Sequence, residues 1–202
     1  MRLIWSALSA FVAASVISLP AAAAGGQAAT TLYALQTSLI YANTSGAGPA
    51  IGSVTPGTPL QVSGEVKNGL EEFTLDAWSQ QGDDTTLFAA QGERIVLVTL
   101  ADSAPHPKVL SMAKDDYGNV WNKVELSDFV KSDSLTPDQN AVWKQAITLY
   151  STRCSACHAL HKPSEFTVNQ WPKILQTMTK NAALQPAEAA LVTQYIQAHA
   201  KQ

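Results

Sequence analysis

The sequence predicts two domains, a small antiparallel β barrel followed by an all-α domain. Residues 31–130 contain short period-two and β-branched segments that are separated by turn signals. Beyond Thr136 the apolar residues recur with helical spacing. The charges divide at the same point, because residues 25–136 carry six basic and thirteen acidic side chains and residues 137–202 carry six and three. We therefore expect a β domain over 25–135 and a helical domain over 136–202.

Residues 1–24 have the order of a secretory signal peptide. Arg2 supplies a positive start, residues 3–19 are mostly apolar, and residues 22–24 offer a small-residue cleavage site. An uncleaved membrane anchor is the alternative, since the run is slightly long, but its four serines weaken insertion. We expect cleavage and a periplasmic mature protein with no later membrane span. The net charge of -3 gives no indication of nucleic-acid binding.

The β part is expected to form several short strands. Two segments alternate in period two, one is rich in β-branched residues, and two flank the turn at residues 115–119 as a hairpin. These segments are residues 60–62 and 73–78, residues 94–100, and residues 109–113 with 120–126. Strands of this length and spacing are typical of a small antiparallel barrel.

The helical part is expected to hold three helices. Thr136 can cap the first, whose apolar stripe leads to Cys154. Asn169 can cap a second helix over residues 170–180, and a third begins near Pro186.

The two cysteines of the chain, Cys154 and Cys157, are followed directly by His158. A redox dithiol normally lies at a helix N-terminus within a βαβ framework, which this context lacks. A zinc site needs four converging ligands, and His161 is the only further candidate close in sequence. A disulfide across two residues would constrain the unfolded chain very little.

The pattern Cys-x-x-Cys-His is typical of covalent haem attachment. The two thiols add to the two vinyl groups of the porphyrin, and the adjacent histidine can bind the iron. Attachment of this kind follows export in bacteria, which agrees with the signal peptide. We therefore expect one covalent haem c held by Cys154 and Cys157, with His158 as the proximal iron ligand.

The distal iron ligand has several candidates. Met178 lies twenty positions after His158, near the end of the second expected helix, and its thioether could bind the opposite face. Methionine is also a common core residue. His199 on the last helix is the main alternative, and His161, Met112 or an open site are further ones.

Several stretches resemble a known family, the pentahaem c-type cytochromes that serve periplasmic trimethylamine-N-oxide reductases. The C-terminal monohaem domain of that family is similar to residues 153–163, 165–167, 169–172 and Met178. The bacterial SH3-like module that precedes it is similar to Tyr33, residues 39–41, residues 56–62, Trp78 and residues 92–95. The resemblance implies an N-terminal all-β SH3-like small barrel and a C-terminal all-α c-type cytochrome domain.

The resemblance also implies a function. Those cytochromes begin with a membrane-anchored tetrahaem region that takes electrons from quinol, whereas this chain has one haem motif. It is thus expected to be an electron-transfer protein of anaerobic respiration and not an enzyme. Its expected partners are an upstream quinol-oxidising cytochrome and a downstream molybdenum-containing N-oxide or S-oxide reductase. A haem sensor or regulatory binding module with an open distal site is the alternative, and a peroxidase would need a distal acid–base residue.

Overall fold

The computed structural model describes residues 29–46 and 48–201, so the expected signal peptide over 1–24 lies outside the described residues. Ten strands join in one sheet in the order β10-β1-β4-β5-β6-β7-β3-β2-β9-β8. Their bounds are β1 Thr30–Ala34, β2 Ser38–Tyr41, β3 Gly52–Val54, β4 Pro59–Lys67, β5 Leu70–Gln80, β6 Asp83–Ala90, β7 Glu93–Leu100, β8 Lys108–Lys114, β9 Val120–Lys131 and β10 Leu135–Thr136. The expected hairpin is confirmed, because β8 pairs antiparallel with β9 from Lys108↔Glu125 to Lys114↔Val120.

Six of these strands close into a barrel. β5 pairs with β6 on one edge and with β9 on the other, and the ring continues through β7, β3 and β2. The pairing of β5 with β9 is the longest, from Leu70↔Lys131 to Gln80↔Trp121. Alternate side chains of β5, such as Phe73 and Leu75, are buried inside because successive strand residues face opposite sides.

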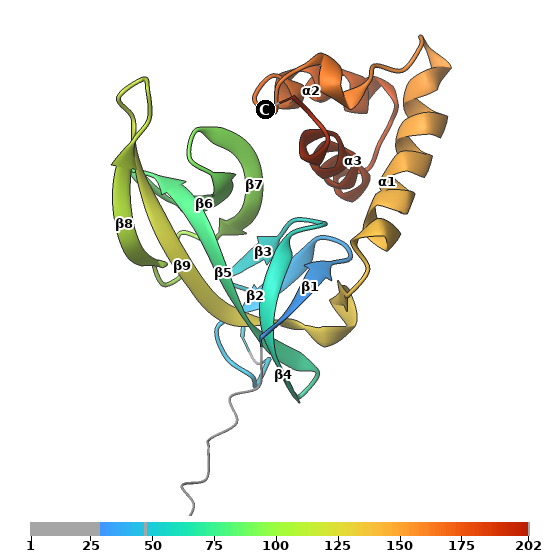
Figure 1. The fold of residues 1–202 in the computed structure, drawn as a ribbon. Coiled ribbons are helices and arrows are strands. Elements are labelled where there is room, and N and C mark those ends of the chain that lie inside the picture. The colour runs from blue at the N-terminus through green and yellow to red at the C-terminus, as the bar shows by residue number, and fades with distance from the viewer. Residues whose placement is uncertain (1–28, 47, 202) are drawn as a thin grey trace, which may run out of the picture.

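Three helices follow the barrel, and Figure 1 shows them gathered on one side of it, away from the β8–β9 hairpin. They are α1 Gln139–Arg153, α2 Trp171–Asn181 and α3 Pro186–Ala198. Short 3-10 turns lie at Ser132–Ser134, Cys154–Ala156 and Pro163–Glu165. Among residues 29–46 and 48–201, none of the helices has the length and apolar content that crossing a membrane requires.

Two of the expected helix caps are wrong. Thr136 belongs to β10 and pairs with Tyr33, so Asp138 caps α1 by accepting a hydrogen bond from the Asn140 amide at 2.9 Å. At α2 the capping position falls to Gln170, and the side chain of Asn169 binds the barrel instead. In both cases the residue that local spacing predicted as a helix cap instead contacts a residue far away in the chain.

The expected fold class is also wrong. A mostly β structure, with 41% of residues in strands and 28% helical, replaces the small SH3-like barrel joined to an all-α cytochrome domain. The sheet extends beyond the six-stranded barrel because β5 pairs with three strands, β4, β6 and β9. The three short helices form no separate all-α domain, since their side chains bond to the backbone of β7 and Thr167 forms a parallel β-bridge with Lys201.

Candidate functional site

The cysteine motif begins where α1 ends. Cys154 is the C-cap of α1, and its amide donates to the Tyr150 carbonyl. Val142, Ala146 and Tyr150 bury one face of α1, and Cys154 continues that face with only 8% exposure. Cys157 is exposed, and both thiols are free. The end of the helix therefore sets the two sulfur atoms in different environments, one in the core and one at the surface.

One cavity contains both cysteines and has a volume of about 310 Å³. One wall comes from the motif and the other from the C-terminal end of α2. The lining residues are Thr152, Arg153, Cys154, Ala156, Cys157, His158, Met178, Asn181 and Ala182. This volume lies at the lower end of the range for small-molecule sites. Two thiols, an imidazole and a thioether thus line the same space.

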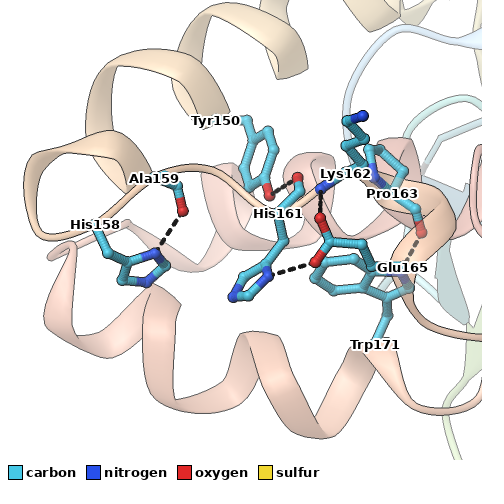
Figure 2. A network of polar contacts seen from close by, with 8 residues as sticks. All are labelled: Tyr150, His158, Ala159, His161, Lys162, Pro163, Glu165 and Trp171. Carbon is cyan, nitrogen blue, oxygen red and sulfur yellow. Dashed lines mark hydrogen bonds and ion pairs between the residues drawn. The ribbon is translucent and has the colours of Figure 1, made fainter.

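The imidazole of His158 has a defined orientation, as Figure 2 shows. Its Nδ1 lies 2.7 Å from the Ala159 carbonyl, which can only accept, so Nδ1 carries the proton and donates it. The lone pair is then on Nε2. A metal-binding histidine normally donates its other ring N–H in this way.

Behind His158, a polar network holds the loop that leads to α2. Tyr150 donates from its hydroxyl to the His161 carbonyl at 2.8 Å, and Nδ1 of His161 lies 2.7 Å from Glu165 Oε2 (Figure 2). Glu165 Oε1 accepts from the Lys162 amide at 2.8 Å. The Lys162 amide, and then His161, lower the pKa of Glu165, whereas burial raises the pKa of Tyr150 to about 12.

Aromatic side chains pack beneath this loop. Trp171 is fully buried, donates from Nε1 to the Pro163 carbonyl at 2.7 Å, and meets Phe166 edge-on at 5.1 Å between ring centroids. The ring of His161 lies 5.4 Å from that of His158 and 6.4 Å from that of Trp171. Trp171 therefore belongs to the core of the helical part, and the loop is fixed on both sides.

The four candidates for the distal ligand lie in different places. Met178 is half-buried and lines the cavity together with Cys157 and His158. His199 bonds through Nδ1 to the Tyr195 carbonyl and packs against Trp143, and it is not among the lining residues. The His161 ring turns to Glu165, and Met112 lies exposed on β8. The structure therefore brings only Met178 of these four into the cavity.

The geometry also bears on the other roles considered for the cysteines. Burial raises the pKa of the Cys154 thiol, and its place at a helix C-terminus favours positive rather than negative charge. A reactive dithiol needs a thiol whose pKa is lowered, which is the opposite of the shift at Cys154. Within residues 29–46 and 48–201, no group of three or more His, Cys, Asp or Glu side chains is placed to hold a metal ion.

These residues fit a haem c. Free thiols two positions apart are present for the two vinyl groups, and an imidazole nitrogen with its lone pair free lies beside them. The cavity walls offer a thioether on the second side. The sequence had singled out all four of these residues but missed Asn181 and Ala182. Asn181 lies three positions after Met178 and Ala182 lies four, so helical spacing from Met178 could have identified them as lining residues.

Comparison with known proteins places this chain in a family. Residues 26–135, more than half of the chain, match the family model described as "TorC third cytochrome c domain". The chain belongs to this family. The match covers the barrel, which contains neither cysteine, and residues 150–202 match a second model described as "Dihaem cytochrome c". The resemblance to cytochromes of trimethylamine-N-oxide reductase systems is thereby confirmed.

The relatives of this TorC-family chain are also c-type cytochromes. It is 30% identical over 153 residues to the cytochrome c-type protein TorY of Escherichia coli O157:H7, covering 75% of this chain and 41% of TorY. It is 28% identical to TorY of Haemophilus influenzae over 63% of this chain and 35% of that protein. It is 25% identical to TorC of Escherichia coli K12 over 88% of this chain and 46% of TorC. The chain thus spans less than half the length of these curated relatives, and no solved structure matches it.

The expectation of a single haem is overturned. The match to the dihaem model points to more than one haem, although it supports haem c itself. Both cysteines of the chain belong to one motif. A further haem would therefore need a site without thioether bonds to this chain.

Proposed function

We propose that the chain is an electron-transfer protein of the c type rather than an enzyme that transforms a substrate. In this proposal Cys154 and Cys157 would hold a haem c through thioether bonds, and Nε2 of His158 and the thioether of Met178 would be the iron ligands. One observation carries the proposal: a single cavity is lined by both cysteines, His158 and Met178.

When bound, the haem supplies a one-electron Fe(III)/Fe(II) couple. The residues of this chain would set its properties. The hydrogen bond from His158 to the Ala159 carbonyl fixes the tautomer and makes Nε2 a more basic iron ligand. The thioether of Met178 favours the reduced iron, so the potential would be higher than with two histidine ligands. Cys157 and His158 are exposed, which leaves this edge of the site accessible to a partner protein.

The partners and the location belong to the same proposal. The relatives are named cytochrome c-type proteins TorY and TorC, which supports a place in an electron-transfer chain. We propose that the protein is periplasmic, with a signal peptide over residues 1–24, a β unit over 25–135 and a cytochrome unit over 136–202. Electrons would come from a quinol-oxidising cytochrome and pass to a molybdenum-containing N-oxide or S-oxide reductase.

Covalent attachment is the decisive test. The haem of the purified protein should resist extraction by acidified acetone and stay with the polypeptide in denaturing electrophoresis. Cys154→Ser or Cys157→Ser should weaken or abolish this retention, because each removes one thioether bond. Ser155→Ala, between the two cysteines, is the matched control and should keep the haem.

Two outcomes would contradict the proposal. One is a wild-type protein, expressed with a haem attachment system, that carries no covalent haem. The other is a ferrous wild-type protein that binds carbon monoxide at once, because a filled distal position should exclude it. That second outcome would favour a haem sensor with an open site.

A further inference from the structure

The first half of β7 has a free edge on the side that faces the helices. β3 pairs with β7 only from Val98 to Leu100. Thr55 extends this contact through its amide to the Leu97 carbonyl at 2.9 Å and its hydroxyl to the Val96 carbonyl at 2.8 Å. Backbone groups nearer the start of β7 have partners outside the sheet, at exposed positions near Gly92 and at more buried positions farther along the strand.

Three amide side chains from the helical part bond to this edge, and one of them, Gln194, shares the Val96 carbonyl with Thr55. Asn169 accepts from the Arg94 amide at 2.7 Å and donates to the Gly92 carbonyl at 2.8 Å. It thus pairs with β7 much as the backbone of a neighbouring strand would. We call Asn169, Gln194 and Gln197 the amide clamp.

The two glutamines of the amide clamp come from α3. Gln194 donates to the Val96 carbonyl at 2.7 Å. Gln197 donates to the Arg94 carbonyl at 3.0 Å and to the Val168 carbonyl at 2.9 Å. Their exposures are 7% and 1%. Buried amides with satisfied partners fix one relative orientation, because any displacement leaves polar groups unpaired.

The amide clamp also fixes the start of α2. Gln197 joins Val168 to β7, and the Val168 amide donates to the Lys201 carbonyl at 3.1 Å. Asn169 is two residues before Trp171, where α2 begins. Met178 follows Trp171 by two helical turns, about 10 Å along the axis. Because a short helix moves as a rigid rod, a shift at its start carries Met178 with it.

The opposite wall of the cavity has its own attachment to the barrel. Trp143 on α1 packs on Gly57, in the turn between β3 and β4, so closely that a Cβ at Gly57 would overlap its ring. α1 leads directly into Cys154 and the residues up to His158. The His158 wall and the Met178 wall are therefore joined to the barrel at separate points.

We propose that the barrel is a rigid frame that sets the separation between His158 and Met178 across the haem site. Asn169, Gln194 and Gln197 are positioning residues in this proposal, since they act on Met178 through α2. The inference rests on the proposed function and deepens it. It gives residues 26–135, which contain no cysteine, a role in controlling the redox site.

The test compares Asn169→Leu with the wild type in the purified protein with its haem attached. Two measurements report on the Met178–iron bond: the weak far-red charge-transfer band of the ferric protein and carbon monoxide binding to the ferrous protein. Loss of two hydrogen bonds of ordinary strength should raise the fraction with an open iron roughly tenfold. Carbon monoxide should bind faster by a similar factor, and the far-red band should weaken.

Matched variants separate positioning from general destabilisation. Asn169→Asp keeps the acceptor for the Arg94 amide but loses the donor to Gly92, so its effect should be intermediate. Asn140→Leu changes an exposed asparagine on α1 and should alter neither signal. If Asn169→Leu fails to fold, Gln194→Met removes a single bond and should give a smaller change of the same kind.

Different results would overturn different statements. Folded variants of the amide clamp with covalent haem, an unchanged far-red band and unchanged carbon monoxide binding would overturn the frame role alone. A wild type with covalent haem but no far-red band would overturn Met178 ligation and the frame role with it.

Discussion

At the scale of single residues, the hydrogen bonds around His158 determine what the cavity can bind. The Ala159 carbonyl accepts a hydrogen bond from the Nδ1–H group of His158, so Nε2 is the free ligand atom. Glu165 bonds to Nδ1 of His161 in the same loop, and His161 is not among the residues that line the cavity. The two histidines thus differ in their hydrogen-bond acceptors, and only His158 lines the cavity.

Met178→Ala tests the distal ligand. We expect the far-red band to disappear, the reduction potential to fall and carbon monoxide to bind the ferrous protein, because the iron loses a thioether. Spectra of both redox states and a potentiometric titration measure these effects. His199→Ala is the control, since His199 packs against Tyr195 and Trp143 away from the cavity lining. The reverse pattern would make His199 the ligand.

Glu165→Gln tests the loop network. The folded pKa of Glu165 lies below its usual value of 4.5, so its ionised form contributes stability above that pH. This contribution is lost as the pH falls through the folded pKa. We expect the wild type to melt at a higher temperature than the variant near pH 7, and the gap to close below about pH 4.

Thermal unfolding followed by circular dichroism across this pH range is the measurement. Glu72→Gln, at an exposed carboxylate, is the control and should show no such pH dependence. A Glu165 difference that stays constant down to pH 3 would mean that the charge does not stabilise the loop.

At the scale of elements, α1 is fixed to the barrel where Trp143 covers Gly57. The chain has φ +78° at Gly57, a left-handed conformation that favours glycine, and the ring occupies the space where a side chain would lie. Trp143 also packs against Tyr195 of α3 at 6.0 Å between centroids. One contact therefore joins the turn between β3 and β4, α1 and α3.

Gly57→Ala should destabilise the protein more than Gly82→Ala. Both positions have positive φ, +78° and +92°, so each substitution should cost about 1–2 kcal/mol of strain. Only Gly57 has the Trp143 ring in the way, which should add about 1–3 kcal/mol. Denaturant unfolding of both variants measures the difference. Equal losses would show that α1 can move off the turn at little cost.

At the scale of the whole molecule, the charge is unevenly distributed. The barrel carries most of the acidic side chains, and the helical part has an excess of lysine and arginine. Lys162 lies in the loop after the motif, and Lys173 and Lys180 lie on α2, the helix that carries Met178. Exposed basic side chains near the cysteine motif favour an acidic partner, because long-range attraction raises the rate of encounter.

We predict that electron transfer to the proposed reductase partner slows as salt rises above about 0.1 M, where the Debye length is about 10 Å. Lys162→Glu and Lys173→Glu should slow it further at low salt and less at high salt. Lys131→Glu, on an exposed position of β9, is the control. Stopped-flow measurement of the bimolecular rate tests this. A rate that responds to neither salt nor the substitutions would indicate apolar docking.

The sequence alone determined the local elements and the motif on which the proposed haem chemistry rests. Cys154, Cys157 and His158 are adjacent in the chain, so their spacing indicated haem c without knowledge of the fold. The strands around residues 73–78 and 94–100 and the hairpin at residues 115–119 followed from alternation and turn residues, because these patterns are local. Two expectations failed: the small SH3-like barrel with a separate all-α domain, and the single haem that the one cysteine motif had indicated.

Only the tertiary structure decided how the parts meet. Met178 was favoured in sequence over His199, with His161 and Met112 as further candidates, and packing placed only Met178 of these four in the cavity. Asn169 has the sequence context of a helix cap, yet its side chain bonds to Gly92 and Arg94, which are more than seventy residues away in the chain. Closure of the barrel joins residues that are far apart in the chain, and so does the contact of Trp143 with Gly57. Local sequence patterns carry no information about which distant residues meet.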